Sequence, residues 1–200
     1  MKRLHEEYGD RVRFVDVTVR QAHPGETRGA YRTVEEKHDD ARAYQADEGI
    51  PWPVLIDDLA GTVHQTYGGM SDPVYLIDAV GHVAFYNMWA HAPSVKTAID
   101  ELLVRGGQSG PVSGGMDRTP HMAASFVNGW HGLRRGGWRS VLEFELATPG
   151  AATLTFVGHL AKPILAPLAL RTAPLPVSTR VALGVGMATL ALVVGRAVRR

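Results

Sequence analysis

The fold is decided by the stretch DPVYLIDAVGHVAFYNMW, residues 72–89, which holds two apolar runs separated by a turn. The runs are Val74–Ile77 and Val83–Tyr86, and a short segment containing Gly81 joins them. Two β-rich runs joined in this way predict an antiparallel hairpin. Pro73 cannot donate to a strand ladder, so we expect it at the start of the first strand. The stretch therefore predicts a hairpin inside an α/β domain.

Upstream of the hairpin, the apolar spacing predicts alternating helices and strands. Residues 12–19 alternate apolar with polar side chains and are rich in valine, which predicts a central strand. Thr33 followed by Glu36 is a capping-box signature for a helix over residues 34–48. Its expected inward stripe is Val34, His38, Ala41 and Tyr44. The remaining predicted elements are an N-terminal helix with Leu4 and Tyr8 on one face, a strand at 54–56, and helices at 60–67 and 93–105.

Composition excludes several classes of function. The chain has no cysteine, so it can form neither disulfides nor thiolate metal sites. Its formal net charge of +1 gives no argument for a nucleic-acid partner. The charged N-terminus lacks the apolar core of a signal peptide. Asp57-Asp58 and His38-Asp39-Asp40 are interpreted as turn and helix residues, so the sequence predicts neither a metal site nor a cofactor.

The second half of the chain has a different character. Residues 106–118 are rich in Gly and Ser and predict a flexible linker between a domain at 1–105 and a helical, membrane-associated region at 119–200. Residues 181–195 carry no charge and predict a transmembrane helix, whose C-terminal arginines place the tail in the cytoplasm. Residues 151–170 are apolar around Lys162 and predict an interfacial or re-entrant partner. The alternative is a buried helical hairpin in a soluble, cytoplasmic protein.

Three segments resemble one protein family. They are Ala22-His23-Pro24 after a valine-rich strand, residues 67–77, and Gly81-His82-Val83-Ala84-Phe85-Tyr86. In order and spacing they resemble the iodothyronine deiodinases, in the redoxin branch of the thioredoxin-fold superfamily. The resemblance covers residues 1–105. It implies a thioredoxin-like domain with a central sheet of three or four strands, flanking helices, and oxidoreductase chemistry on thiols or selenols.

The resemblance also implies site residues. His23 matches a histidine near the redox centre, where an imidazole relays protons near neutral pH. Pro73 matches the proline that faces the nucleophile, which implies that Asp72 and Pro73 contact a substrate or a thiol or protein redox partner. Here the chain begins inside the first helix and lacks the cysteine or selenocysteine loop, so we expect a truncated or degenerate domain. We also expect an open edge beside residues 12–19 and no turnover by this chain alone. The alternative is a non-enzymatic, membrane-associated scaffold or binding protein.

Overall fold

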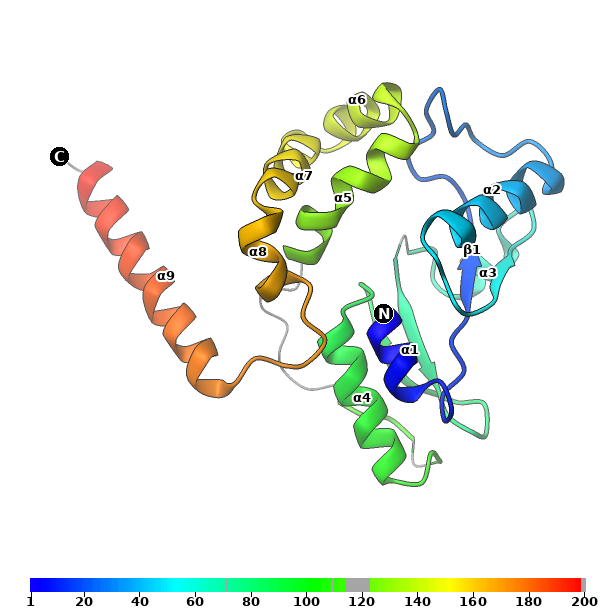
Figure 1. Ribbon diagram of the computed structural model, residues 1–200, viewed down its shortest axis with the longest axis horizontal. Coiled ribbons are helices and arrows are strands. Elements are labelled where there is room, and N and C mark those ends of the chain that lie inside the picture. Colours follow the sequence, from blue (N-terminus) through cyan, green and yellow to red (C-terminus); the bar gives the residue numbers. More distant parts are fainter. Residues whose placement is uncertain (71, 109, 114–122, 199–200) are drawn as a thin grey trace.

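The computed structural model describes residues 1–70, 72–108, 110–113 and 123–198 and has a mixed α/β architecture (Figure 1). Short strands and four helices form the first part, helices α5–α8 form a separate layer, and α9 projects away from both. The elements are α1 Lys2–Tyr8, β1 Asp16–Thr18, α2 Val34–Asp47, β2 Val54–Ile56, α3 Thr62–Thr66, β3 Val74–Ile77, β4 Val83–Asn87, α4 Ala92–Val104, α5 Ala123–Arg135, α6 Trp138–Ala147, α7 Ala151–Leu160, α8 Lys162–Ala169 and α9 Val177–Val198.

The predicted hairpin is confirmed. Strands β3 and β4 pair antiparallel with Tyr75 opposite Tyr86, and their rings lie 4.8 Å apart. The buried carboxylate of Asp78 holds the turn, because it accepts hydrogen bonds from the backbone N–H groups of Val80 at 3.1 Å and His82 at 2.8 Å. An Asp side chain that satisfies its own turn in this way fixes the loop and, with it, the register of both strands.

The prediction of one central sheet is wrong. Strand β1 contains only Asp16–Thr18 and pairs in parallel with β2, while β3 and β4 form a second two-stranded sheet. Val12 and Phe14, which alternate as strand residues in the sequence, instead pack against the hydrophobic core. The reason is that β2 is three residues long, so it can pair with only a short part of the alternating segment. Among the described residues, β2 is the only strand beside β1, which leaves the other edge of β1 without a ladder partner.

The hydrophobic core lies between α1, α4 and the hairpin. Leu4 and Tyr8 of α1 are buried together, as their i, i+4 spacing predicts. They join Ile99 and six other apolar residues of the hairpin and α4: Leu76, Ala84, Phe85, Val95, Ala98 and Leu102. Val112, inside the predicted linker, also packs here, and its N–H donates to the Ala84 carbonyl at 2.8 Å. The division into domains stays a prediction, because residues 114–122 lie outside the described residues.

Helix α2 begins as predicted but faces the core differently. The Thr33 hydroxyl accepts from the Glu36 N–H at 3.2 Å, which confirms the cap. Of the predicted inward stripe only Ala41 is buried, whereas Val34 is exposed. Lys37 is buried instead of Val34. The Lys37 Nζ donates to the Asp58 carbonyl at 3.0 Å, and this bond draws that side of the helix inward.

Helices α5–α8 form a compact layer. Helix α7 crosses α5 closely, since Gly158 faces the backbone of Phe126, and Val127, Ala152 and Thr155 are buried in the same contact. The predicted continuous stretch 151–170 is broken: α7 and α8 meet at 98°. Pro163 in the first turn of α8 explains the break, because proline lacks the N–H that would continue α7.

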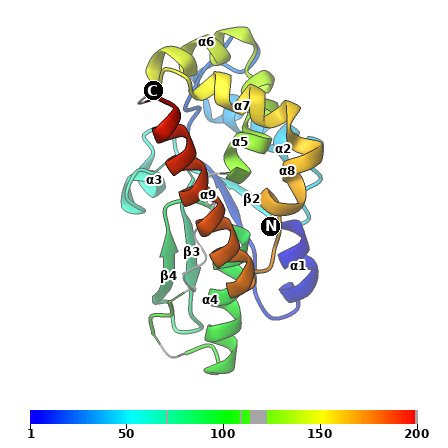
Figure 2. The ribbon, with the colours of Figure 1, turned by 90° about the vertical axis from the view of Figure 1, so that its left-hand side faces the viewer.

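Helix α9 starts earlier than predicted. It begins at Val177, includes Arg180, and its 22 residues correspond to about 33 Å of helix. It projects away from the rest of the chain (Figure 1; Figure 2). Within residues 177–197, an 18-residue window has a mean hydropathy of 1.8 with none of it buried, so the segment is long and apolar enough to cross a membrane.

Candidate functional site

The structure places His23 against the helical layer. Its Nδ1 meets the Glu143 carboxylate of α6, and its ring lies 4.6 Å from the Phe144 ring. The His23 carbonyl accepts from the Ser140 hydroxyl at 2.7 Å. The imidazole therefore contacts Glu143 and Phe144 of α6, and Ser140 of the same helix holds the His23 backbone.

The loop that carries His23 is fitted closely to α6. The Glu26 carboxylate accepts from the backbone N–H groups of Trp138 at 2.6 Å and Arg139 at 2.8 Å, so it caps the N-terminus of α6. Its own backbone N–H and that of Arg139 lower the pKa of Glu26. A side chain at Gly25 would lie 2.0 Å from the Gly136 carbonyl oxygen, so only glycine fits there. These contacts join the two parts of the fold.

A second network holds the same loop to α2. The Asp40 carboxylate accepts from Gln21 Nε2 at 2.8 Å and from the Tyr31 hydroxyl at 2.5 Å, and it also meets the Arg28 guanidinium. Burial of the phenol, and then its bond to Asp40, raises the pKa of Tyr31. Asp40 is therefore a structural anchor for residues 21–31.

Asp72 lies at a cavity of about 410 Å³ where six parts of the chain meet. They are the start of α1, the C-cap of α2, the residue before Pro73, the segment after β4, the first half of α5, and the end of α8 with the chain that follows it. The lining residues are Met1, Lys2, Arg3, Glu48, Asp72, Trp89, Ala90, His91, Ala92, Pro93, Ala124, Ser125, Asn128, Ala169, Leu170, Arg171 and Thr172. His23 is not among them, so the structure does not bring His23 and Asp72 together in this cavity.

The pKa of Asp72, which lines the cavity, is raised. Desolvation raises the pKa of Asp72, and the negative charge of Asp16 raises it further. A hydrogen bond from the Ala90 backbone N–H lowers it in part. Restricted hydration also raises the pKa of Asp16. The Trp52 indole N–H, close by but outside good hydrogen-bond geometry, and the Met1 ammonium oppose that rise. Titratable groups with raised pKa values mark candidate sites, and Asp72 is the one of these two that lines the cavity.

His91 is the cavity residue that sequence reasoning missed. It is buried at the N-cap of α4, and its Nδ1 lies 2.9 Å from the Ser94 hydroxyl. The signal in the sequence is a polar residue two positions ahead of Pro93, since proline marks the first turn of a helix. Unlike His23, this imidazole lines the same cavity as Asp72.

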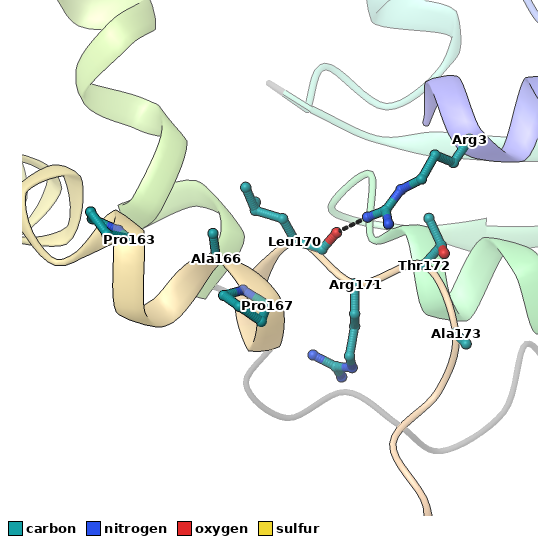
Figure 3. Close-up of a pocket in the computed structure, with 8 residues that line it drawn as sticks. All are labelled: Arg3, Pro163, Ala166, Pro167, Leu170, Arg171, Thr172 and Ala173. Atoms are coloured by element: carbon teal, nitrogen blue, oxygen red, sulfur yellow. Dashed lines mark hydrogen bonds between the residues drawn. The ribbon is translucent and has the colours of Figure 1, made fainter.

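A second cavity of about 540 Å³ adjoins the first (Figure 3). Prolines and alanines of α8 and the residues that follow it form its wall, and the two cavities share Arg3, Leu170, Arg171 and Thr172. The Arg3 guanidinium donates to the Leu170 carbonyl, and Arg171 donates to the Leu168 carbonyl at 2.8 Å. Both cations satisfy carbonyl groups at the C-terminal end of α8.

The Asp57 carboxylate accepts hydrogen bonds from backbone N–H groups. Asp57 is buried, which tends to raise its pKa, but the N–H groups of His64, Val63 and Asp58 bond its carboxylate and leave the pKa lowered. In the part of the chain that the structure describes, no three His, Cys, Asp or Glu side chains gather as metal ligands. Pro73 is half-buried ahead of β3.

No protein-family model, curated protein or solved structure matches the chain.

Proposed function

We propose that the chain is a membrane-anchored, redoxin-like protein whose anchor is α9. The observation that carries the proposal is a fully exposed apolar helix of membrane-spanning length. An exposed apolar surface of this size is unfavourable in water, and a bilayer would bury it on all sides. In a soluble helical hairpin, α7 and α8 would have to cover α9, yet every residue from 181 to 197 is exposed.

The proposed orientation places the C-terminal tail in the cytoplasm. Arg196, Arg199 and Arg200 lie within five residues of one another in the sequence, and such clusters favour the cytoplasmic side. The α/β part would then lie on the opposite side of the membrane.

The redoxin-like assignment rests on the arrangement around Asp72. The order α1, β1, α2, β2, α3, β3, β4 and α4, with Pro73 directly ahead of β3, supports a thioredoxin-like domain. The cavity at the start of α1 supplies a place for a substrate beside Asp72 and His91. Because the chain has no cysteine, any reacting thiolate belongs to the substrate or to a protein redox partner. The proposed role of this cavity is therefore to bind thiol compounds.

One observation favours the alternative of a non-enzymatic scaffold. His23, the proposed catalytic residue, is held against α6: its ring contacts Glu143 and Phe144, and its carbonyl accepts from Ser140. An imidazole fixed in this way serves to join two layers. A catalytic role for His23 stays a prediction, and the contacts favour the structural role.

The anchor is tested by alkaline carbonate extraction of membranes from cells that express the full chain. We expect the chain to stay in the membrane pellet. Leu190→Asp, in the middle of α9, should release it, because one acid at mid-membrane costs about 3 kcal/mol. The matched control is Val104→Asp, at an 89% exposed position on α4, which should leave extraction unchanged. Release of the unaltered chain by carbonate would contradict the anchor.

The thiol-binding role is tested by titrating the full chain in detergent with glutathione and its disulfide. Trp89 lines the cavity, so binding should change its fluorescence. We expect Asp72→Asn and Pro73→Ala to weaken binding, and His23→Gln to leave it unchanged. Thiol peroxidase turnover should be absent for all variants. No fluorescence change with either compound would favour the scaffold.

A further inference from the structure

Charge is divided unevenly along the chain. All 20 acidic residues lie at or before Glu145, so residues 146–200 carry none. The same segment carries six cations: Lys162, Arg171, Arg180, Arg196, Arg199 and Arg200. Helices α7, α8 and α9 therefore form a purely cationic and apolar region, whereas the part that precedes them is net acidic. Such an asymmetry is typical of a segment that meets an anionic surface.

Helices α7 and α8 carry large exposed apolar side chains, and in α7 their spacing differs from that of the residues buried against α5. We call this set of side chains the α7–α8 pad; it consists of Leu154, Val157, Leu160, Ile164 and Leu165, and Ile164 is 82% exposed. The other side of α7 holds the buried Ala152, Thr155 and Gly158 against α5. The pad is thus a second apolar surface, separate from the packed interior of the layer.

Helices α7 and α8 lie on the side of the molecule from which α9 projects (Figure 1). Figure 1 and Figure 2 show α7 and α8 on the side of α5 that is turned toward α9, away from the strands. Helix α9 does not cover the pad, since its own side chains are exposed throughout. Lys162 lies at the 98° bend between α7 and α8, where a long side chain can reach lipid phosphates while its methylene groups stay near the apolar pad.

We propose that the α7–α8 pad lies in the boundary between headgroups and acyl chains of an anionic bilayer. The inference rests on the proposed anchor and adds the lipid class and the contacting residues. The apolar residues would be buried by the acyl chains, while Lys162 and Arg180 would meet the anionic headgroups. The bend allows both short helices to lie along the surface, whereas neither is long enough to cross it.

The absence of cysteine permits a direct test. Single substitutions Ile164→Cys in the pad, Val193→Cys in α9 and Val104→Cys on α4 each give one thiol for a fluorescent label. All three positions are exposed, so labelling should not disturb packing. The full chain is reconstituted at a low protein-to-lipid ratio into vesicles of phosphatidylcholine with phosphatidylglycerol, and quenching by brominated lipid is measured. We expect quenching at positions 164 and 193 and none at 104.

The pattern of quenching separates the pad from the anchor. Quenching at 193 alone overturns the pad and leaves the anchor in place. Quenching at 164 without 193 supports the pad and overturns the anchor, and quenching at neither position overturns both. Quenching at all three positions indicates non-specific adsorption and overturns the pad. A label at 164 that is shielded from aqueous iodide but not reached by brominated lipid shows that protein covers the pad, which also overturns the inference.

The lipid class is tested by Lys162→Gln in the Ile164→Cys chain. Loss of one cation near an anionic surface should weaken binding of the pad to the bilayer about fivefold. Replacing the anionic vesicles with vesicles of phosphatidylcholine alone should weaken that binding by at least the same factor. The matched control is Lys96→Gln, which removes a cation that pairs with Glu7 and Asp100 in the α/β part. Equal quenching at 164 in anionic and zwitterionic vesicles would refute the anionic preference.

Discussion

Replacing Gly158 with alanine should separate the two helices that form the centre of the helical layer. A Cβ atom at this position would lie 2.5 Å from the carbonyl oxygen of Phe126 and 2.7 Å from its carbonyl carbon. Both atoms belong to the backbone of α5, so no side-chain rotation can make room. The added methyl group must push α7 away from α5 or distort one of them.

The magnitude follows from two opposing effects. Alanine favours an α-helix over glycine by about 1 kcal/mol. Overfilling a packed contact costs about 1–3 kcal/mol. Gly132→Ala is the matched control, because Gly132 lies in α5 with nothing within 4 Å of its added Cβ. The control gains the helix preference alone, so the two variants should differ in free energy of unfolding by the packing cost, about 1–3 kcal/mol.

Urea unfolding of the full chain in detergent measures this difference. Trp130 of α5 packs on Phe156 of α7 at 4.9 Å between ring centroids, so its fluorescence reports the same helix contact. We expect Gly132→Ala to unfold at a higher urea concentration than the unaltered chain and Gly158→Ala at a lower one than the control. A Gly158→Ala chain as stable as Gly132→Ala would refute the close crossing of α5 and α7.

Two further predictions concern the α/β part. Leu4→Ala removes a fully buried side chain between α1 and α4 and should cost about 2–5 kcal/mol in urea unfolding, with exposed Val104→Ala as the control. Asp16→Asn tests the raised pKa of Asp16. Because this pKa is higher in the folded than in the unfolded chain, ionisation of the Asp16 carboxyl destabilises the fold at pH values above the folded pKa. The destabilisation disappears as the pH falls through the folded pKa toward the ordinary value of 3.8. The variant should therefore melt at a higher temperature than the unaltered chain at pH 7, and the difference should shrink toward pH 4; a lower melting temperature at pH 7 would contradict the raised pKa.

Local features were predictable where neighbouring residues determine them. The hairpin turn depends on Asp78 and Gly81, and the start of α2 depends on Thr33 and Glu36, so short sequence patterns contain the required information. The pairing of β1 was not predictable in this way. Alternation over residues 12–19 indicates an extended segment, but the length of β2, 38 positions later, decides how much of it pairs.

The candidate site shows the same limit for function. A histidine after a valine-rich strand resembles a proton relay, and nothing near His23 in the sequence indicates otherwise. Its partners Ser140, Glu143 and Phe144 come from a helix that begins more than a hundred residues later. His91, in contrast, lies at the N-cap of α4 and lines the Asp72 cavity, although its sequence context indicates only a helix start. Which of two histidines faces a cavity depends on how the layers pack, because packing decides whether an imidazole is held by a neighbouring helix or by the cavity wall.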